Sequence, residues 1–139
     1  MYKFKFLFIL VAILSLFVVP DATAQKNFYD GFSGADTLAN ADTSLYTSSH
    51  YFKDLGVMEF HVAIDSISGT TAGTISYQYS LSPAATEWHT IGTDTVTDAD
   101  DQSHVHQLTN FAAARVRIQL ITTGTQSTRA VPYISFREN

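Results

Sequence analysis

The chain has 139 residues, a formal net charge of −5 and no cysteine. This length is typical of one domain, and the lack of cysteine excludes disulfides, thiol catalysis and zinc–cysteine sites. An acidic chain with scattered arginines also argues against binding to nucleic acid or to an anionic membrane, because both depend on clustered cations.

The N-terminal segment is typical of a signal peptide. Lys3 and Lys5 give it a positive start, residues 6–19 form a nearly unbroken apolar run, and Ala22-Thr23-Ala24 offers small residues to a peptidase. We therefore expect residues 1–24 to be a cleaved signal peptide. The alternative is a retained membrane anchor, although a span needs about 20 apolar residues. Both hypotheses place the rest of the protein outside the cell, or on a cell or virion surface.

Residues 25–54 are expected to form an N-terminal arm and the first short strands. Turn signals interrupt the start of the arm, and residues 38–46 have room for one or two strands. Three aromatic side chains lie in the arm, and they either pack locally or reach a neighbouring subunit: Phe28, Tyr29 and Phe32.

Residues 55–139 are expected to form the core of the domain. Apolar and polar residues alternate over residues 58–64 and again over residues 75–81, which is typical of half-buried strands. We expect these two strands to pair as an antiparallel hairpin. Tyr77 and Tyr79 share the apolar face of the second strand, so they belong to the core. If that face is exposed, they form a platform for sugar rings or a protein partner.

The next two strands are shorter. Residues 87–91 are expected to form a strand whose Trp88 fills the core between two sheets. A polar, acidic stretch over residues 93–102, expected to be a strand end followed by a loop, then leads to a strand at residues 104–108. Neither strand shows helical periodicity.

Two further strands end the chain. Alternation is clear from Arg115 to Leu120, and a hairpin loop over residues 122–128 leads to a last strand at residues 131–137. Pro132 indicates an edge position or a bulge in that strand. Short strands with regular turn signals predict an all-β fold, a single antiparallel β-sandwich of jelly-roll or immunoglobulin-like topology.

Arg115 and Arg117 are candidate binding residues, together with the two tyrosines. They lie two residues apart on a strand and therefore share one face. Guanidinium groups form bidentate hydrogen bonds with carboxylates, so the pair suits an acidic glycan or a partner protein. The alternative is that both arginines pair with acids on neighbouring strands.

Two metal sites are candidates, and calcium in the acidic loop is the preferred ion of the two. Oxygen-rich loops bind calcium, and two imidazoles on one strand face share a metal when a third ligand is near. The alternative is a solvated acidic loop beside a polar strand face, because no EF-hand or zinc-site spacing is present. The candidate ligands are Asp98, Asp100, Asp101, His104 and His106.

Catalysis is not expected. Glu59, His61 and Asp65 share a strand face, and an acid beside a histidine can orient a general base. A nucleophile and a cleft would also be needed, and no Gly-x-Ser-x-Gly motif is present. A polar strand face explains the three residues without any chemistry.

The segment from Val57 to Arg137 resembles a β-sandwich module found in virion structural proteins of tailed bacteriophages, such as head-decoration and fibre-associated domains. The stretches that carry the resemblance are Tyr77–Ser82, Trp88–Gly92, Asn110–Phe111, Arg115–Ile118 and Gly124–Thr125. The resemblance implies a non-enzymatic sandwich for assembly or attachment, and it supplies no catalytic residues.

We therefore expect an exported, non-enzymatic β-sandwich that works in assembly or surface attachment. Its expected partners are further copies of itself or another surface or virion protein, and the expected contact loops cover residues 93–102 and 122–128. The alternative is a carbohydrate-binding or adhesin module that binds a glycan, for which calcium is the candidate ion. That alternative predicts an exposed aromatic strip from Tyr51, Tyr77 or Tyr79.

Overall fold

The computed structural model describes residues 27–31 and 36–138, and every regular element in these ranges is a β-strand. The predicted signal peptide and Phe32 of the predicted arm lie outside the described residues. A helix long and apolar enough to cross a membrane does not occur in the ranges described. The predicted all-β class is confirmed.

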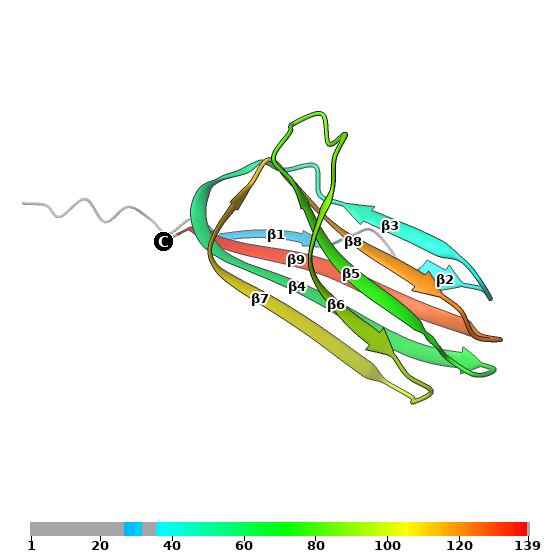
Figure 1. Ribbon diagram of the computed structural model, residues 1–139. Coiled ribbons are helices and arrows are strands. Elements are labelled where there is room, and N and C mark those ends of the chain that lie inside the picture. Colours follow the sequence, from blue (N-terminus) through cyan, green and yellow to red (C-terminus); the bar gives the residue numbers. More distant parts are fainter. Residues whose placement is uncertain (1–26, 32–35, 139) are drawn as a thin grey trace, which may run out of the picture.

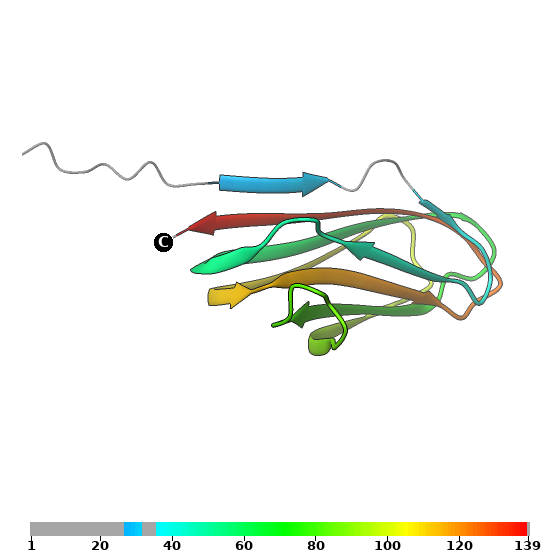
Figure 2. The same ribbon diagram turned by 90° about the horizontal axis from the view of Figure 1, so that it is seen from above.

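One sheet contains five strands in the order β1-β9-β4-β7, with β2 also paired to β9. All its pairings are antiparallel. Figure 2 shows β1 beside β9 at one edge. We call this sheet A, and its strands are β1 (Asn27–Gly31), β2 (Asp36–Leu38), β4 (Phe52–Ser68), β7 (Gln102–Ala113) and β9 (Ser127–Glu138).

The other sheet, sheet B, contains four strands in the order β3-β8-β5-β6 (Figure 1). From β2 onwards the chain changes sheet at every connection except the one between β5 and β6. This alternation is the jelly-roll arrangement of an antiparallel sandwich, so it decides the topology that the sequence left open. The strands of sheet B are β3 (Thr43–Thr47), β5 (Gly73–Ser80), β6 (His89–Val96) and β8 (Arg115–Thr122).

The core lies between the two sheets, where the alternating apolar residues of the central strands meet. Phe60 of β4 and Tyr77 of β5 are fully buried, and their ring centroids lie 5.4 Å apart. Burying a side chain of this size stabilises a fold by roughly 1.5–3 kcal/mol. Further completely buried side chains on the same strands and on their neighbours include Met58, Val62, Ile75, Val116, Ile118 and Ile134.

The predicted hairpin between residues 58–64 and 75–81 is wrong. β4 pairs with β7 and β9, whereas β5 pairs with β6 and β8, so the two segments lie in opposite sheets. The loop over residues 122–128 likewise links sheet B to sheet A and closes no hairpin. A short turn can join strands in one sheet or in facing sheets, and the alternation of residues is the same in both cases.

These two sheet-to-sheet turns pack against each other. The backbone N–H of Ala72 donates to Oε1 of Gln126 at 2.6 Å, and the N–H of Thr123 donates to the carbonyl of Ala72 at 3.0 Å. Gly69 has a φ of +77°, and a Cβ there would overlap the carbonyl of Thr125. The first turn therefore needs glycine both for its backbone conformation and for its close approach to the second.

Pro132 lies in an inner strand, which differs from the predicted edge. On one side β9 pairs with β4 throughout. On the other side β2 pairs with β9 up to Ala130, and β1 pairs with it from Tyr133 onwards. Val131 and Pro132 thus fall where neither of these two short strands pairs with β9, so Pro132 is tolerated at a local edge.

Partly buried polar side chains meet where β6 and β7 face each other. The hydroxyl of Tyr77 donates to Oδ2 of Asp94 at 2.7 Å, and the Nδ1 atom of His104 lies 3.8 Å from the same oxygen. The ring of His106 stacks on Tyr77 with centroids 4.8 Å apart. A Cβ at Gly92 would lie 2.5 Å from the ring of His106, so only glycine lets β6 approach this stack.

We expect Gly92→Ala to lower the free energy of unfolding by about 1–3 kcal/mol, because the added methyl group overpacks the stacked imidazole. The cost should be clearly smaller in a His106→Ala background, where the obstructing ring is absent. Urea unfolding of the four proteins of this double-mutant cycle measures both quantities. An equal cost in the two backgrounds would contradict the proposed contact.

Tyr77 should make stability depend on alkaline pH. Burial, together with its hydrogen bond to Asp94, raises the pKa of Tyr77 above the ordinary value of 10.0. The folded state therefore keeps a proton that the unfolded chain releases, so this contribution is complete below about pH 10 and is lost as pH rises further.

The variant Tyr77→Phe, compared with the wild type, tests this pH dependence, because the other tyrosines are unchanged in it. The difference in unfolding free energy between the two proteins should be constant below about pH 10 and should shrink above it by about 1.4 kcal/mol per pH unit. Chemical denaturation across this pH range measures the difference. Parallel curves throughout would show that Tyr77 does not carry the effect.

Candidate functional site

The outer face of sheet B carries mainly hydroxyl and amide side chains. They alternate along each strand with buried residues such as Tyr46, Ile75 and Ile118. The register sets them in rows: Thr47, Arg117, Gln78 and Thr90; then Leu45, Gln119, Ser76 and Thr93; then Thr43, Ile121, Thr74 and Thr95. Arg117 is the only charged residue in these rows, and Arg115 precedes it on β8.

Arg117 is held at the centre of its row by aromatic and amide partners. Its guanidinium carbon lies 4.0 Å from the centroid of the Trp88 ring, a cation–π contact. Its Nε atom donates to Oε1 of Gln78 at 2.6 Å. Gln78 is itself held by hydrogen bonds from Nε2 to Thr90 Oγ1 at 3.4 Å and to Gln119 Oε1 at 3.3 Å. The guanidinium is thereby fixed in position, while its two terminal amino groups remain available as donors.

Trp88 does not fill the core as predicted. It is half-buried, and it lies against Arg117 on the outer face of sheet B. A register shift next to Tyr77 and Gln78 leaves Ile91 as an extra residue in β6, and Ile91 packs on the core instead. The loop that leads to Trp88 projects beyond the end of the sheets in Figure 1.

Arg115 holds a second aromatic ring next to the first pair. Its guanidinium carbon lies 4.3 Å from the centroid of the Tyr51 ring, and its Nη2 atom donates to the Tyr51 hydroxyl at 3.1 Å. Nη1 donates to the carbonyls of Ser48 and Ser49, in the segment between β3 and β4. Tyr51 stays 55% exposed, so it is the tyrosine of the predicted strip that is available to a ligand.

We call these four residues, Tyr51, Trp88, Arg115 and Arg117, the arginine–aromatic platform. Two residues along a strand separate the arginines by about 7 Å. Within the described residues neither arginine has a carboxylate partner, because the only contact at ion-pair distance there is between His104 and Asp94. The predicted alternative, pairing with acids on neighbouring strands, is therefore absent from the described part of the chain. Partial burial lowers the pKa of Arg117, but a guanidinium remains charged at neutral pH.

The other two candidate binding residues lie elsewhere. Tyr77 is fully buried, so its ring offers no face to a ligand. Tyr79 is half-buried, and its ring packs against His89 and Phe111 with centroids 5.3 Å and 5.6 Å away. The tyrosines of β5 thus follow their predicted role in the core.

The candidate metal ligands are not brought together. His104 and His106 point into the sandwich, whereas Asp100 and Asp101 are exposed in the loop between β6 and β7. Asp98 accepts a hydrogen bond at Oδ1 from the N–H of Thr71 at 3.0 Å. Within residues 27–31 and 36–138, no three His, Cys, Asp or Glu side chains are arranged to hold a metal ion.

The same loop is closed by a single glutamine side chain. Nε2 of Gln102 donates to the carbonyls of Thr97 and Ala99 at 2.6 Å and 2.9 Å, and its Oε1 accepts from the N–H of Thr97 at 3.0 Å. The carbonyl oxygens of Thr97 and Ala99 are thus already engaged in hydrogen bonds. Calcium needs six to eight oxygen ligands, and these two carbonyls of the loop are taken by Gln102.

Ser103 lies beside the strand face of Glu59, His61 and Asp65, and the sequence did not indicate this. Nε2 of His61 lies 2.7 Å from Oγ of Ser103, because His61 and Ser103 project from the same face of neighbouring strands. The other ring nitrogen, Nδ1, is buried and has no hydrogen-bond partner among the described residues. A serine–histidine pair in which no carboxylate orients the imidazole lacks the third group of a catalytic triad.

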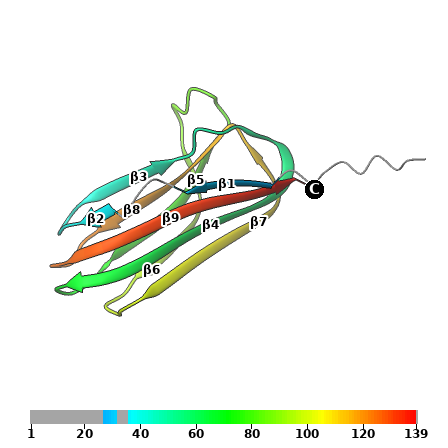
Figure 3. The same ribbon diagram turned by 180° about the vertical axis from the view of Figure 1, so that it is seen from behind.

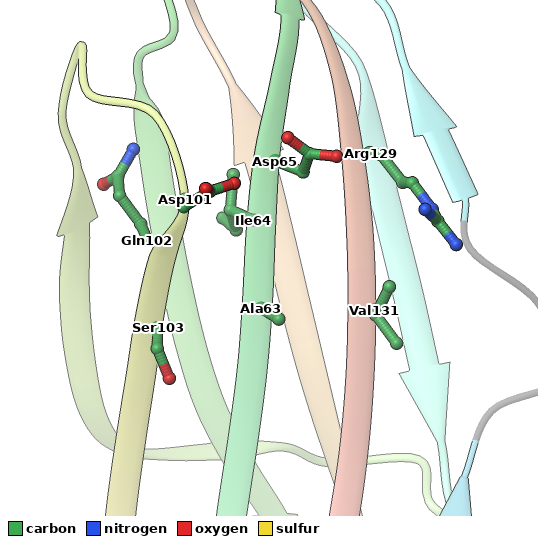
Figure 4. A pocket seen from close by; sticks show the side chains of 8 residues that line it. All are labelled: Ala63, Ile64, Asp65, Asp101, Gln102, Ser103, Arg129 and Val131. Atoms are coloured by element: carbon green, nitrogen blue, oxygen red, sulfur yellow. The ribbon is translucent and has the colours of Figure 1, made fainter.

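A shallow depression lies beside this pair, on the outer face of sheet A (Figure 4). It has a volume of about 370 Å³, and the small side chain of Ala63 leaves room at its centre. Asp65, Asp101 and Arg129 give it charges of both signs, so it lacks the uniform charge of the platform. The remaining lining residues are Ile64, Gln102, Ser103 and Val131.

Comparison with proteins of known structure shows the fold. A pilus subunit of Bacillus endospore appendages, described as disulfide-linked pili, has a TM-score of 0.51 at 16% identity, over 83% of this chain and 89% of that one. The second structure contains the CBM22-1 and GH10 modules of an endo-1,4-β-D-xylanase from Clostridium thermocellum, complexed with xylohexaose. Its TM-score is 0.52 at 11% identity, over 85% of this chain and 25% of that one. A structure of infectious bursal disease virus has a TM-score of 0.50 at 8% identity, over 83% of this chain and 32% of that one.

This chain therefore spans only about a quarter of the xylanase chain and about a third of the virus chain. Neither a protein-family model nor a curated protein matches the sequence. The predicted resemblance to virion modules holds for the sandwich in general and is not specific to tailed bacteriophages. At these identities the comparisons establish a β-sandwich that pilus, virus and xylanase chains share.

Proposed function

We propose that the protein is a non-enzymatic surface-attachment module that binds an acidic glycan on the outer face of sheet B. The observation that carries the proposal is the pair of arginines that stack on aromatic rings and lack carboxylate partners in the described part of an acidic chain. A positive patch that the protein does not neutralise itself suits a ligand that brings negative charge.

The chemistry of the face favours a sugar polymer over other anions. Tyr51 and Trp88 offer ring surface for stacking, and the Thr, Ser and Gln rows beside them offer hydroxyl and amide groups for hydrogen bonds to sugar hydroxyls. Arg117 can donate two parallel hydrogen bonds to one carboxylate through its terminal amino groups. Arg115 positions Tyr51 and adds charge. The open sheet surface suits an extended chain better than a small molecule, which prefers an enclosed pocket.

The shared fold is compatible with this role and does not decide it. One chain with the same fold belongs to a xylanase solved with a xylose oligomer, and another belongs to a pilus. Binding and assembly are both functions of such sandwiches, so the argument for glycan binding depends on the platform.

Arg117→Gln should weaken binding to a polymer that carries carboxylates by about tenfold or more, because a charge-assisted bidentate contact is worth about 1.5–3 kcal/mol. Polygalacturonate, alginate and hyaluronate are the test polymers, and the methyl ester of each is its neutral counterpart. Isothermal titration or affinity electrophoresis measures the binding. Wild-type affinity should also fall as salt concentration rises, since the arginines are partly exposed.

The matched control is Arg129→Gln, which removes an exposed arginine from the outer face of sheet A. Its affinity should equal that of the wild type, and thermal unfolding should show that both variants fold. Equal binding to acidic polymers and their esters, or equal loss in both variants, would overturn the proposal.

Trp88→Ala should weaken binding to both charged and esterified polymers, because stacking of a sugar on the indole ring does not depend on the carboxylate. The change also removes the cation–π partner of Arg117, so the loss should be larger for the acidic polymer. Parallel titrations with each polymer and its ester separate the two effects. An unchanged affinity for both ligands would exclude Trp88 from the binding face.

A further inference from the structure

The edge strand β7 differs from the other edges of the sandwich. It is 12 residues long, and it contains no Asp, Glu, Lys, Arg, Pro or Gly. Natural sheets protect edge strands from pairing with other chains by charges, prolines, bulges or short length. β1, β2 and β3 are short, with 5, 3 and 5 residues, and the pairing of β6 contains a bulge. The pairing of β7 with β4 also shifts register, but only beyond Leu108. The stretch of β7 from Gln102 to Leu108 therefore combines length with a lack of these protections.

The first part of β7 is also regular, and its backbone is open on its outer side. Its register with β4 runs without a shift from Ile64↔Gln102 to Met58↔Leu108. Residues 102–109 make no other backbone hydrogen bond within the part of the chain that the structure describes. Figures 1 and 3 show β7 along the outer margin of the sandwich, with β6 set back from it. A second strand can therefore approach this edge.

The sequence of the open segment reads nearly the same in both directions. Ser103-His104-Val105-His106-Gln107 has the valine at its centre, a histidine on each side and a small or amide polar residue beyond each histidine. Val105 points away from the core and is 55% exposed. Two identical strands that pair across a two-fold axis run antiparallel, so each residue faces its mirror position.

We propose that two copies of this chain pair through β7 about a two-fold axis at Val105, which joins their A sheets into one continuous sheet. Val105 of each copy then faces Val105 of the other, and Ser103 faces Gln107. The same axis sets His104 opposite His106. β-branched pairs and hydrogen-bonding polar pairs are favourable across antiparallel strands, and β7 contains no Asp, Glu, Lys or Arg that would face a like charge. The near-palindrome makes a second copy a better occupant than an unrelated strand.

Val105→Lys tests the interface without touching the core, because two lysines would meet at the two-fold axis. Sedimentation of the full exported protein over a concentration series should show a wild-type dimer and at least a tenfold weaker dimer for Val105→Lys. Ile67→Lys is the matched control, since Ile67 is 56% exposed on β4 and lies away from the β7 edge. Its dimer should equal the wild type.

Cysteine substitutions test the register, and the chain has no native cysteine to interfere. Under oxidation Val105→Cys should form a disulfide-linked dimer, because facing residues bring their Cα atoms to about 4.5–5.5 Å. Ser103→Cys alone should not cross-link, whereas a mixture of Ser103→Cys and Gln107→Cys should. A monomeric wild type, a dimer that Val105→Lys leaves intact, or efficient cross-linking by Ser103→Cys alone would each overturn the proposal. None of these results depends on glycan binding.

Discussion

The contact between Phe60 and Tyr77 connects the two halves of this sandwich. Each ring comes from a strand with a neighbour on both sides, β4 in sheet A and β5 in sheet B. Tyr77 also brings a hydroxyl into the interior, and a buried hydroxyl needs a partner. Asp94 supplies it from β6, the stacked ring of His106 covers Tyr77 from β7, and Gly92 leaves room for that ring. One buried tyrosine thus determines which side chains of both neighbouring edge strands point inward.

Because polar side chains of β7 point inward, an apolar side chain of this strand points outward. With His104 and His106 directed to the interior, the alternation of the strand leaves Val105 in solvent. The pattern is the reverse of a common half-buried strand, whose apolar residues face the core. An exposed valine at an open edge and a partly buried polar cluster are therefore two consequences of the same register.

Alternation in the sequence predicted the buried apolar residues at the centre of β4, β5 and β8, and therefore that Arg115 and Arg117 project outward. It did not predict that Gln78 and Ser80, on the polar face of β5, are buried as well. It could not predict pairing, because the residues of β4 alternate in the same way whether β5 lies beside it or across the core. The inward direction of His104 and His106 was missed because it depends on Tyr77 and Asp94, which are distant in sequence. Trp88 and Ile91 are three residues apart, so a regular strand cannot bury both. That spacing did not show which of the two faces outward.

The two proposed surfaces are compatible in space, and their combination has a consequence for attachment. Pairing through β7 extends sheet A, so it leaves the outer face of sheet B uncovered in both copies. A two-fold axis perpendicular to the joined sheet turns both platforms toward the same side. Two sites that face one polymer-coated surface bind it with an avidity that can exceed the single-site affinity by about 10²–10⁴. A single platform of four side chains is a small site, and a dimer that presents two of them in parallel would hold an extended acidic glycan far more firmly than either copy alone.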